Sequence, residues 1–205
     1  MERRLAAILA ADVVGYSSLM ADNEAATLEA LKDHRIQVFD PAVKQHRGRI
    51  VKLMGDGVLV EFASVLDAVE CALSIQRQLA EESGVIKLRI GINLGDIIIE
   101  GDDIYGDGVN VAARLEALAD PGGVCISSVV HESIGNRTEV EFADAGEHEI
   151  KNIDRPIKVF QWPAQGQSGS RAKPALALPD KPSIVVLPFD NMSGDPDQEY
   201  FADGI

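Results

Sequence analysis

The sequence contains only two cysteines in 205 residues, Cys71 and Cys125, and they lie far apart. This excludes a disulfide framework and a cysteine-rich metal knuckle, and it favours a reducing compartment such as the cytoplasm. Basic residues are also few, since 19 Lys and Arg stand against 33 Asp and Glu, which gives a net charge of −14. A nucleic-acid surface needs clustered Lys and Arg, so we expect no nucleic-acid partner.

Long apolar runs are missing as well. No stretch approaches the roughly 18 apolar residues of a membrane span, and the N-terminal run is interrupted at Asp12, too early for a signal peptide. The phosphate-loop patterns G-x-x-x-x-G-K-[ST] and G-x-G-x-x-G do not occur, and the four histidines show no metal-binding spacing. We therefore expect a soluble, cytoplasmic chain without a membrane partner, which is neither a P-loop nor a Rossmann enzyme.

The apolar pattern predicts strands that alternate with helices. Strands are expected at 5–14, in a hairpin at 49–62, at 85–101, and at 123–127, 138–143, 146–152 and 156–162. Helices are expected at 24–46, at 65–82 after the capping pair Ser64 and Asp67, and at 108–119. The order β-α-β-β-α-β, followed by further strands, predicts an α+β fold with a ferredoxin-like βαββαβ core and extra C-terminal strands.

The composition changes abruptly after residue 162. Residues 163–182 are rich in Pro, Ala, Gly and Ser and lack periodicity, which is typical of a linker. Residues 183–205 begin with a buried-strand pattern, but about 23 residues are fewer than the roughly 40 that an independent core needs. We therefore expect one domain over 1–162, a linker over 163–182, and the truncated start of a second domain over 183–205.

Two aspartates stand where predicted strands end. Asp12 closes the first strand, and Asp56 lies in the Gly-Asp-Gly tip of the hairpin. Taken singly, Asp12 fits a helix cap and Asp56 fits a turn former. In a split βαβ sheet, however, the first strand lies beside the hairpin, so the two carboxylates can converge. Converging carboxylates repel unless a hard cation lies between them, which favours a Mg²⁺ site.

Lys52 interrupts an apolar strand of the hairpin, and the period of two places it on one face with Ile50 and Met54. It fits either an edge lysine that reaches solvent or a positive donor in a ligand pocket. Asn110 and Arg114 lie four residues apart and therefore share one face of a predicted helix. Such a pair is usually solvated, and the spacing alone assigns it no chemistry.

Four segments resemble, in order and in spacing, the catalytic motifs of the class III nucleotidyl cyclases, in the bacterial adenylate cyclase branch. These segments are ADVVGYS (11–17), VKLMGDG (51–57), LRIGINLG (88–95) and DIYGDGVNVAARLEAL (103–118). The resemblance extends over about residues 5–162. A shorter segment, KPSIVVLPFDNMSGDPDQEYFADGI, resembles the opening of a TolB-like domain that often follows such cyclases.

The resemblance implies a metal site and a base-binding pair. Asp12 and Asp56 match the two metal-binding aspartates, and the main-chain carbonyl of Val13 matches a further ligand, for two Mg²⁺ or Mn²⁺ ions. Lys52 matches a lysine that donates to the purine ring, and Asp103 matches a carboxylate that accepts from the adenine amino group. Lysine donation to N1 and acceptance from N6 fit adenine, whereas guanine presents the opposite polarity.

The resemblance also implies phosphate-binding groups. Arg89 matches an arginine that contacts the outer phosphates of the substrate, and Lys151 matches a phosphate-binding lysine. Gly15, Tyr16 and Ser17 match the strand-to-helix turn whose main-chain N–H groups hold the triphosphate. The N-terminus of a helix is a favourable place for such an anion.

Asn110 and Arg114 match the transition-state pair of the family. By this resemblance Asn110 orients the ribose and Arg114 stabilises charge on the α-phosphate, while the 3′-oxygen attacks in line and pyrophosphate leaves. In the family, the metal residues and the transition-state residues of one site come from opposite partners of a dimer. This chain carries both sets, so the resemblance implies a homodimer with two equivalent sites.

The sequence therefore predicts an adenylate cyclase that converts ATP to 3′,5′-cyclic AMP and pyrophosphate. One alternative is a non-catalytic nucleotide-sensing module that regulates the domain beyond the linker. Another is a guanylate cyclase or a different palm-type nucleotidyltransferase. None of the metal, base-binding or transition-state positions is replaced, and this favours the catalytic hypothesis.

Overall fold

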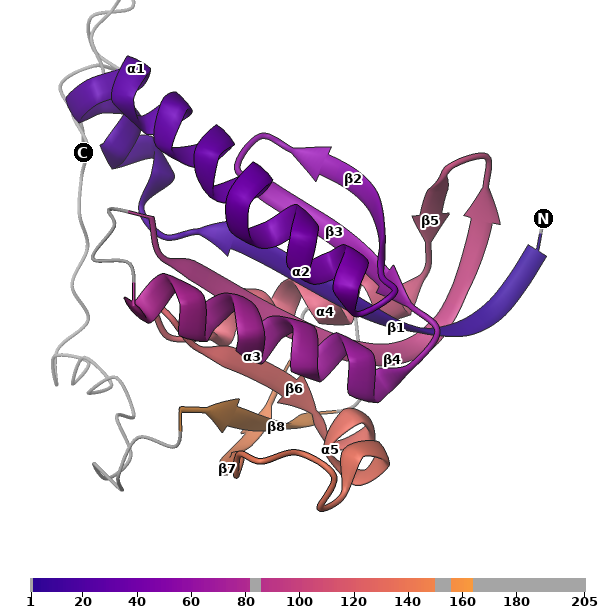
Figure 1. Ribbon diagram of the computed structural model, residues 1–205. Coiled ribbons are helices and arrows are strands. Elements are labelled where there is room, and N and C mark those ends of the chain that lie inside the picture. The colour runs from indigo at the N-terminus through magenta and orange to yellow at the C-terminus, as the bar shows by residue number, and fades with distance from the viewer. Residues whose placement is uncertain (1, 82–85, 150–155, 164–205) are drawn as a thin grey trace, which may run out of the picture. The chain divides into compact units, whose positions relative to one another are not determined.

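The computed structural model describes residues 2–81, 86–149 and 156–163 (Figure 1). The elements follow in the order β1 (Glu2–Val13), α1 (Tyr16–His34), η1 (Arg35–Phe39), α2 (Asp40–Gln45), β2 (Arg49–Met54), β3 (Gly57–Phe62), α3 (Val65–Glu81), β4 (Leu88–Glu100), β5 (Asp103–Tyr105), α4 (Asp107–Leu118), β6 (Val124–Ser127), α5 (Ser128–Ile134), β7 (Ala143–His148) and β8 (Ile157–Trp162). Apart from Pro163, the predicted linker and second domain lie outside the described residues.

Within the described residues, the strands form one eight-stranded sheet with the order β2-β3-β1-β4-β6-β8-β7, and β5 pairs with β4. The first four strands are antiparallel, and β1 lies between β3 and β4. This is the order of a split βαβ core. β6 joins β4 in parallel, and β8 and β7 extend the sheet beyond it. The predicted α+β, ferredoxin-like core with extra C-terminal strands is confirmed.

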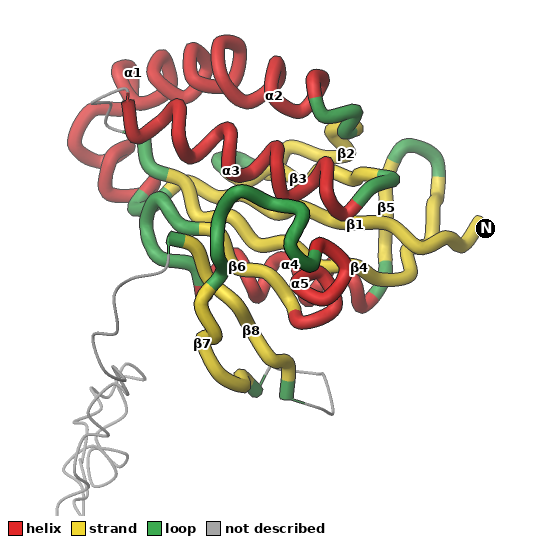
Figure 2. Tube along the Cα trace, turned by 60° about the horizontal axis from the view of Figure 1, so that its bottom comes forward, coloured by secondary structure: helices red, strands yellow, loops and turns green. Residues whose placement is uncertain are grey.

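The central strand β1 is buried on both faces. Its odd-numbered residues from Ala7 to Val13 pack toward α2 and α3, and its even-numbered residues from Ala6 to Ala10 pack toward α4. Figures 1 and 2 show α1, α2 and α3 on one side of the sheet and α4 on the other. Double burial explains why β1 is a continuous apolar run. The same alternation places Asp12 on the α4 face.

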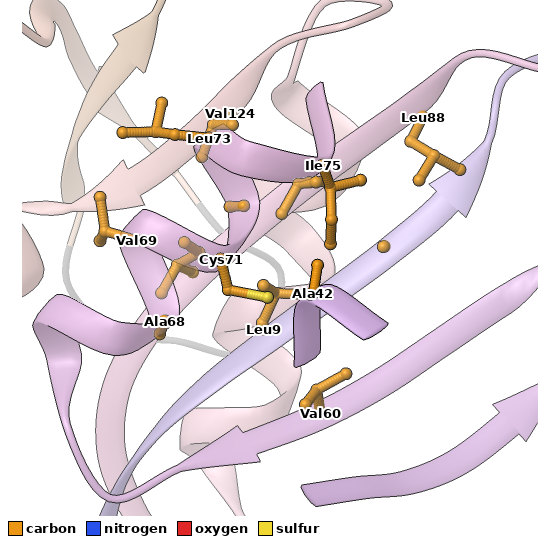
Figure 3. Close-up of a cluster of buried hydrophobic side chains, with 14 of the residues drawn as sticks. Leu9, Ala42, Val60, Ala68, Val69, Cys71, Leu73, Ile75, Leu88 and Val124 are labelled. Carbon is orange, nitrogen blue, oxygen red and sulfur yellow. The ribbon is translucent and has the colours of Figure 1, made fainter. Parts of the chain in front are cut away.

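The larger core cluster lies between the sheet and α3. Leu9 and Val60 of the sheet contact this cluster together with Ala68 and Cys71 of the helix, as Figure 3 shows. Burial raises the pKa of the Cys71 thiol to about 12, and Cys125 is buried with a similarly raised pKa. Both thiols are free and protonated at neutral pH, so they contribute to packing rather than to reactivity.

The helices that cover this face are confirmed with changes at their ends. Asn23 has extended backbone angles inside α1, and its side chain accepts a hydrogen bond from the N–H of Ala26 at 3.1 Å. Asn23 thus caps the helix predicted from residue 24, and the preceding turn from Tyr16 is an additional helical segment that the sequence did not predict. A short π-helix, η1, continues the same path into α2.

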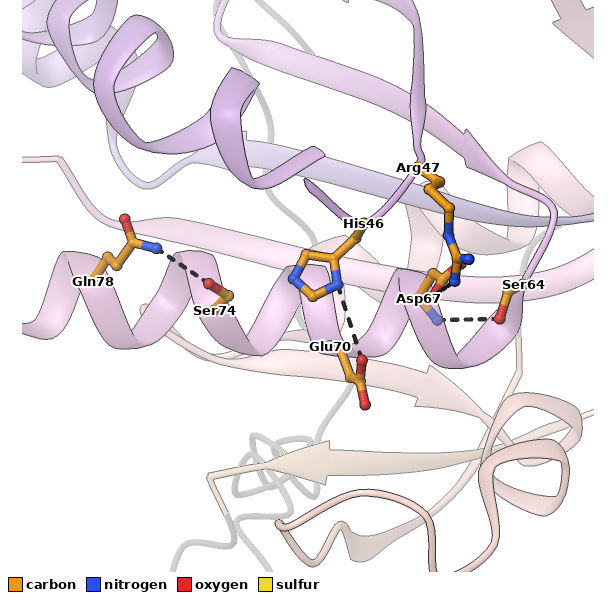
Figure 4. A network of polar contacts seen from close by, with 7 residues as sticks. All are labelled: His46, Arg47, Ser64, Asp67, Glu70, Ser74 and Gln78. Atoms are coloured by element: carbon orange, nitrogen blue, oxygen red, sulfur yellow. Dashed lines mark hydrogen bonds and ion pairs between the residues drawn. The ribbon is translucent and has the colours of Figure 1, made fainter. Parts of the chain in front are cut away.

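The start of α3 shows why a capping pair was predicted there. The N–H of Asp67 donates to the Ser64 hydroxyl at 3.3 Å, but the Asp67 carboxylate turns to Arg47 and accepts two hydrogen bonds of 2.8 Å (Figure 4). Half of the capping box therefore forms, because the arginine outcompetes the main chain for the carboxylate. His46 lies beside Glu70 in the same network, with 4.0 Å between Nδ1 and Oε2.

Other predictions for the second half of the chain need correction. Residues 138–143 alternate like a strand, but only Ala143 is paired, as the first residue of β7, while 138–142 are irregular and Val140 and Phe142 pack into the larger core cluster. The helix α5 was not predicted, because Val129 and Val130 disfavour helix locally while Val130 and Ile134 are buried in the larger core cluster. The strand region predicted at 85–101 is one long strand, β4, and β5 lies where a loop was expected.

Candidate active site

Asp12 and Asp56 meet at the end of β1. The pairing of Ala11 with Val58 brings the tip of the β2–β3 hairpin beside Asp12, and Gly55 has φ of +68°, which the tight turn requires. Burial and the neighbouring Asp12 carboxylate raise the pKa of Asp56. The predicted convergence is therefore confirmed, and the suggestion that Asp12 caps a helix is wrong, because Gly15 occupies the N-cap of α1.

This pair of carboxylates fits a hard divalent cation. Asp12 is half-buried, and burial together with the nearby Asp12 carboxylate raises the pKa of Asp56, so a cation between the two carboxylates would favour their charged forms. Val13, the last residue of β1, adjoins the pair. Across the described ranges, no group of three or more His, Cys, Asp or Glu side chains is placed to bind a metal. A cation held here would therefore depend on main-chain, water or substrate oxygens for its remaining ligands.

Arg89 on β4 lies between two carboxylates. It pairs in register with Asp12, and its Nη2 lies 3.2 Å from Asp12 Oδ2 while its Nε lies 3.2 Å from Glu116 Oε1. Burial, together with the charges of Asp12 and Asp56, raises the pKa of Glu116 to about 7 against the opposing effect of Arg89. Three acidic groups thus surround one guanidinium at this end of the sheet.

A β-bulge decides where Lys52 points. Ile50 pairs with Val60, whereas Lys52 pairs with Leu59, so the register of β2 shifts between them. Val60 belongs to the cluster under α3, and Leu59 belongs to the cluster under α4. Because paired residues of an antiparallel ladder point to the same face, Lys52 lies on the α4 face. The prediction that it shares a face with Ile50 is wrong.

The bulge places Lys52 next to Asp103 of β5. Their hydrogen bond raises the pKa of Lys52 and lowers the pKa of Asp103. Tyr105 donates a hydrogen bond of 3.3 Å to the same carboxylate oxygen, and Arg49 donates one of 2.9 Å to the main-chain oxygen of Asp102. β5 is therefore attached to the hairpin through side chains as well as to β4 through the main chain.

Asn110 and Arg114 lie on the exposed side of α4, while Val111 and Leu115 are buried against the sheet. Within the described parts of the chain, neither polar residue forms an ion pair or a side-chain hydrogen bond. They share one helix face, as predicted. Helix α4 begins after Gly106, whose φ of +136° a residue with a side chain rarely adopts.

The start of α1 fits the predicted anion-binding turn. Gly15 is its N-cap with φ of +68°, and no side chain of the described residues caps this helix end. Tyr16 is half-buried and Ser17 is exposed at the first turn. Lys151 lies outside the described residues.

The candidate residues fall into separate groups on one chain. Asp12, Asp56 and Arg89 gather at the end of β1, whereas Lys52 and Asp103 pair between β2 and β5. Among the described residues, no ion pair or hydrogen bond joins these two groups. Asp12, Arg89 and Lys52 lie on the α4 face of the sheet.

Sequence reasoning missed Glu116. Its position four residues after Ala112, which is buried on the sheet-facing side of α4, was the available signal. An acidic residue one turn from a buried alanine is expected to face the sheet rather than solvent, and a buried carboxylate needs a partner.

The comparisons with known proteins agree with this architecture. Residues 3–162 match the family described as "Adenylate and Guanylate cyclase catalytic domain". The chain belongs to the adenylate and guanylate cyclase family. It is thus a class III nucleotidyl cyclase domain, and the resemblance of its motifs to this class is confirmed, without a choice of branch within the class.

Relatives in this family include a protein of Rhizobium meliloti (strain 1021) named "Putative adenylate cyclase 3". It is 54% identical over 100% of this chain, which spans only 37% of that protein. The crystal structure of an adenylate/guanylate cyclase/hydrolase from Silicibacter pomeroyi is 50% identical, with a TM-score of 0.74 over 78% of this chain and 97% of its own. The guanylyl cyclase Cya2 is 26% identical, with a TM-score of 0.69 over 78% of this chain and 92% of its own.

The family therefore includes enzymes named for either base, and membership alone does not choose between ATP and GTP. None of these comparisons bears on the TolB-like resemblance of the C-terminal segment. Among the described residues, no helix is both long enough and apolar enough to span a membrane.

Proposed function

We propose that this cyclase domain is an adenylate cyclase that converts ATP to 3′,5′-cyclic AMP and pyrophosphate. The observation that supports this choice of base is the contact between Lys52 and Asp103. Together they offer one donor and one acceptor to a purine edge, which matches N1 and N6 of adenine. In guanine, N1 donates and O6 accepts, so the same pair would meet two mismatched groups.

Asp12, Asp56 and the carbonyl of Val13 would hold the divalent cations, Mg²⁺ or Mn²⁺. Bound there, two cations would lower the pKa of the ribose 3′-hydroxyl and neutralise the triphosphate. The rest of the site positions the substrate. In the reaction a bond forms between O3′ and the α-phosphorus, the bond from that phosphorus to the leaving oxygen breaks, and the hydroxyl proton passes to solvent.

The remaining residues act on the phosphates and the ribose. Asn110 orients the ribose, and Arg114 stabilises the charge that develops on the α-phosphate. Arg89 binds the outer phosphates, together with Lys151. The N–H groups of Gly15, Tyr16 and Ser17 at the start of α1 hold the triphosphate, since a helix N-terminus with no side-chain cap has donors to offer.

A homodimer completes the site. The metal group at the end of β1 and the base pair of Lys52 and Asp103 share no contact within the described part of one chain. Two copies related by a two-fold axis would bring the metal group of one copy to the base pair and α4 of the other, twice. A single chain would then be inactive.

The test is an assay of purified protein with Mn²⁺ and ATP, in which cyclic AMP is quantified. Asp56→Ala and Arg114→Ala should each lower the rate by at least about 100-fold, while circular dichroism shows an intact fold. Asp33→Ala, an exposed change on α1, is the matched control and should keep the wild-type rate.

Three outcomes would overturn the proposal. Full activity in either variant would remove the assignment of the site, and faster turnover of GTP than of ATP would make the enzyme a guanylate cyclase. Metal-dependent binding of ATP without any product would favour the nucleotide-sensing module instead.

A further inference from the structure

Arg89 is shared between two carboxylates that belong to different elements. Asp12 lies at the end of β1, and Glu116 lies on α4, each with an oxygen 3.2 Å from a nitrogen of the guanidinium. The Glu116 side chain is only 13% exposed, against 29% for Asp12, so Glu116 is the more enclosed partner. The guanidinium of Arg89 thus neutralises two carboxylates. A change at one carboxylate therefore alters how strongly the guanidinium interacts with the other.

The packing of α4 on β4 fixes Glu116 beside Arg89. Gly91, two residues along β4, lies so close to the helix that a Cβ built there would be 2.1 Å from the main-chain nitrogen of Glu116 and 2.3 Å from the carbonyl oxygen of Ala112. Only glycine permits this approach of the two backbones. The Glu116 main chain is therefore held against the strand that carries Arg89.

We propose that Glu116 is a positioning residue that competes with Asp12 for Arg89 and so leaves Asp12 available to bind a divalent cation. This inference rests on the proposed function, because it assumes the cation site at Asp12 and Asp56. With a cation bound at Asp12, the guanidinium would withdraw from that carboxylate and stay paired with Glu116. Arg89 would then be held in place to meet the outer phosphates of the nucleotide.

The existing contact leaves room for this exchange. Arg89 Nε and Glu116 Oε1 are both buried, and in the described residues neither has a well-directed hydrogen-bond partner despite their separation of 3.2 Å. Buried polar atoms without such partners carry an energetic cost. A shift of Arg89 toward Glu116 would align the pair and recover that interaction as Asp12 is released.

The contact also joins the two halves of the proposed site within one chain. Arg89 and Asp12 belong to the metal group, whereas Glu116 lies on the helix that presents Asn110 and Arg114. In the proposed dimer these halves serve different active sites. Glu116 therefore connects the cation site of one active site to the transition-state helix of the other.

The test measures Mn²⁺ binding to the full 205-residue chain at pH 8 without nucleotide, from the electron paramagnetic resonance signal of free Mn²⁺. Glu116→Gln should weaken the binding about three- to tenfold, because Arg89 then pairs with Asp12 alone. Arg89→Ala should strengthen it by a similar factor. In the Arg89→Ala background, Glu116→Gln should change the affinity less than about twofold.

The double-mutant cycle separates positioning from simple charge. If Glu116→Gln weakens binding equally with and without Arg89, Glu116 acts by direct attraction of the cation and the proposal is wrong. Asp107→Asn removes an exposed negative charge from the same helix and should leave the affinity within about twofold of wild type.

The Asp56→Ala variant distinguishes a failure of the cation site from a failure of the role assigned to Glu116. If this variant binds Mn²⁺ as wild type does, the cation site itself is absent, and both this inference and the metal assignment of the proposed function fall. If Asp56→Ala abolishes binding but the cycle is additive, only the role of Glu116 falls. Because no turnover is measured, an inactive enzyme does not affect either result.

Discussion

Lys52 on β2 and Asp103 on β5 form an ion pair in which Nζ lies 2.5 Å from Oδ2, although 51 residues separate them along the chain. Both side chains are partly exposed, so the attraction contributes little to stability. Under the proposed function the pair matters for binding instead. A purine that entered between the two groups would replace one partner of each, so neither charge would be left without a partner.

The first prediction concerns base choice. Lys52→Glu together with Asp103→Ser reverses the polarity offered to the purine edge, and should lower ATP turnover by at least about 100-fold while raising the preference for GTP. Initial rates of cyclic AMP and cyclic GMP formation measure this. Lys158→Glu with Asp144→Ser breaks an ion pair between β7 and β8 whose lysine is as exposed as Lys52, and this control should keep the ATP preference. An unchanged preference in the first variant would contradict the assignment.

The second prediction concerns the shared sites. Asp56→Ala damages the metal half of a site and Arg114→Ala damages the transition-state half, so each variant alone should be inactive. Mixed in equal amounts, they should regain about a quarter of the wild-type activity, because half of the dimers are mixed and each of these has one intact site. The control is a double variant that carries both substitutions on one chain. A preparation of this double variant alone should show no recovered activity. Failure of the mixture to regain activity would argue against complementary halves.

The third prediction concerns the packing of α4 against β4. Gly91→Ala places a Cβ 2.1 to 2.7 Å from main-chain atoms of α4, which cannot move aside as a flexible side chain can. We expect a loss of about 2–4 kcal/mol in the free energy of unfolding, measured with urea. Gly122→Ala meets no atom within 4 Å but has φ of +80°, and should cost only about 1 kcal/mol. Equal effects of the two variants would show that backbone strain, not helix contact, dominates.

The fourth prediction concerns pH. The Glu116 carboxyl has an ordinary pKa of 4.5 and a folded-state pKa of about 7, set by burial and by the facing Asp12 and Asp56 against Arg89. Between these values the folded chain binds the additional proton, so the free energy of unfolding falls as the pH rises from about 4.5 to 7 and stays lower above.

Glu116→Gln removes this titration. The variant should therefore be more stable than wild type at pH 8, by about 1–3 kcal/mol, and the difference should shrink toward pH 5. Urea unfolding across this range measures it, with Asp107→Asn as the control. A Gln variant that is less stable than wild type at pH 8 would show that the Arg89 contact outweighs the cost of burying the charge.

Much of the fold was predictable because short segments of the sequence indicated particular elements. The unbroken apolar run of β1 indicated burial on both faces, and the Gly-Asp-Gly tip indicated the hairpin. Most of the segment 138–143 misled, because the alternation over 138–142 arises from Val140 and Phe142, which pack into the core without strand pairing. Helix α5 was missed because tertiary packing overrode the local preference of its valines. The linker, the second domain and the cytoplasmic location stay predictions.

The sequence by itself determined part of the candidate site, namely the convergence of Asp12 with Asp56 and the helix face that Asn110 and Arg114 share. Asp12 and Asp56 end neighbouring elements, and Asn110 and Arg114 share a helix face, since strand order and helical period follow from local pattern. Only the tertiary structure decided that a bulge turns Lys52 to the face of Asp103, and that Arg89 lies between Asp12 and Glu116. A change of register and a contact between distant backbones depend on how strands and helices pack, and no local pattern encodes them.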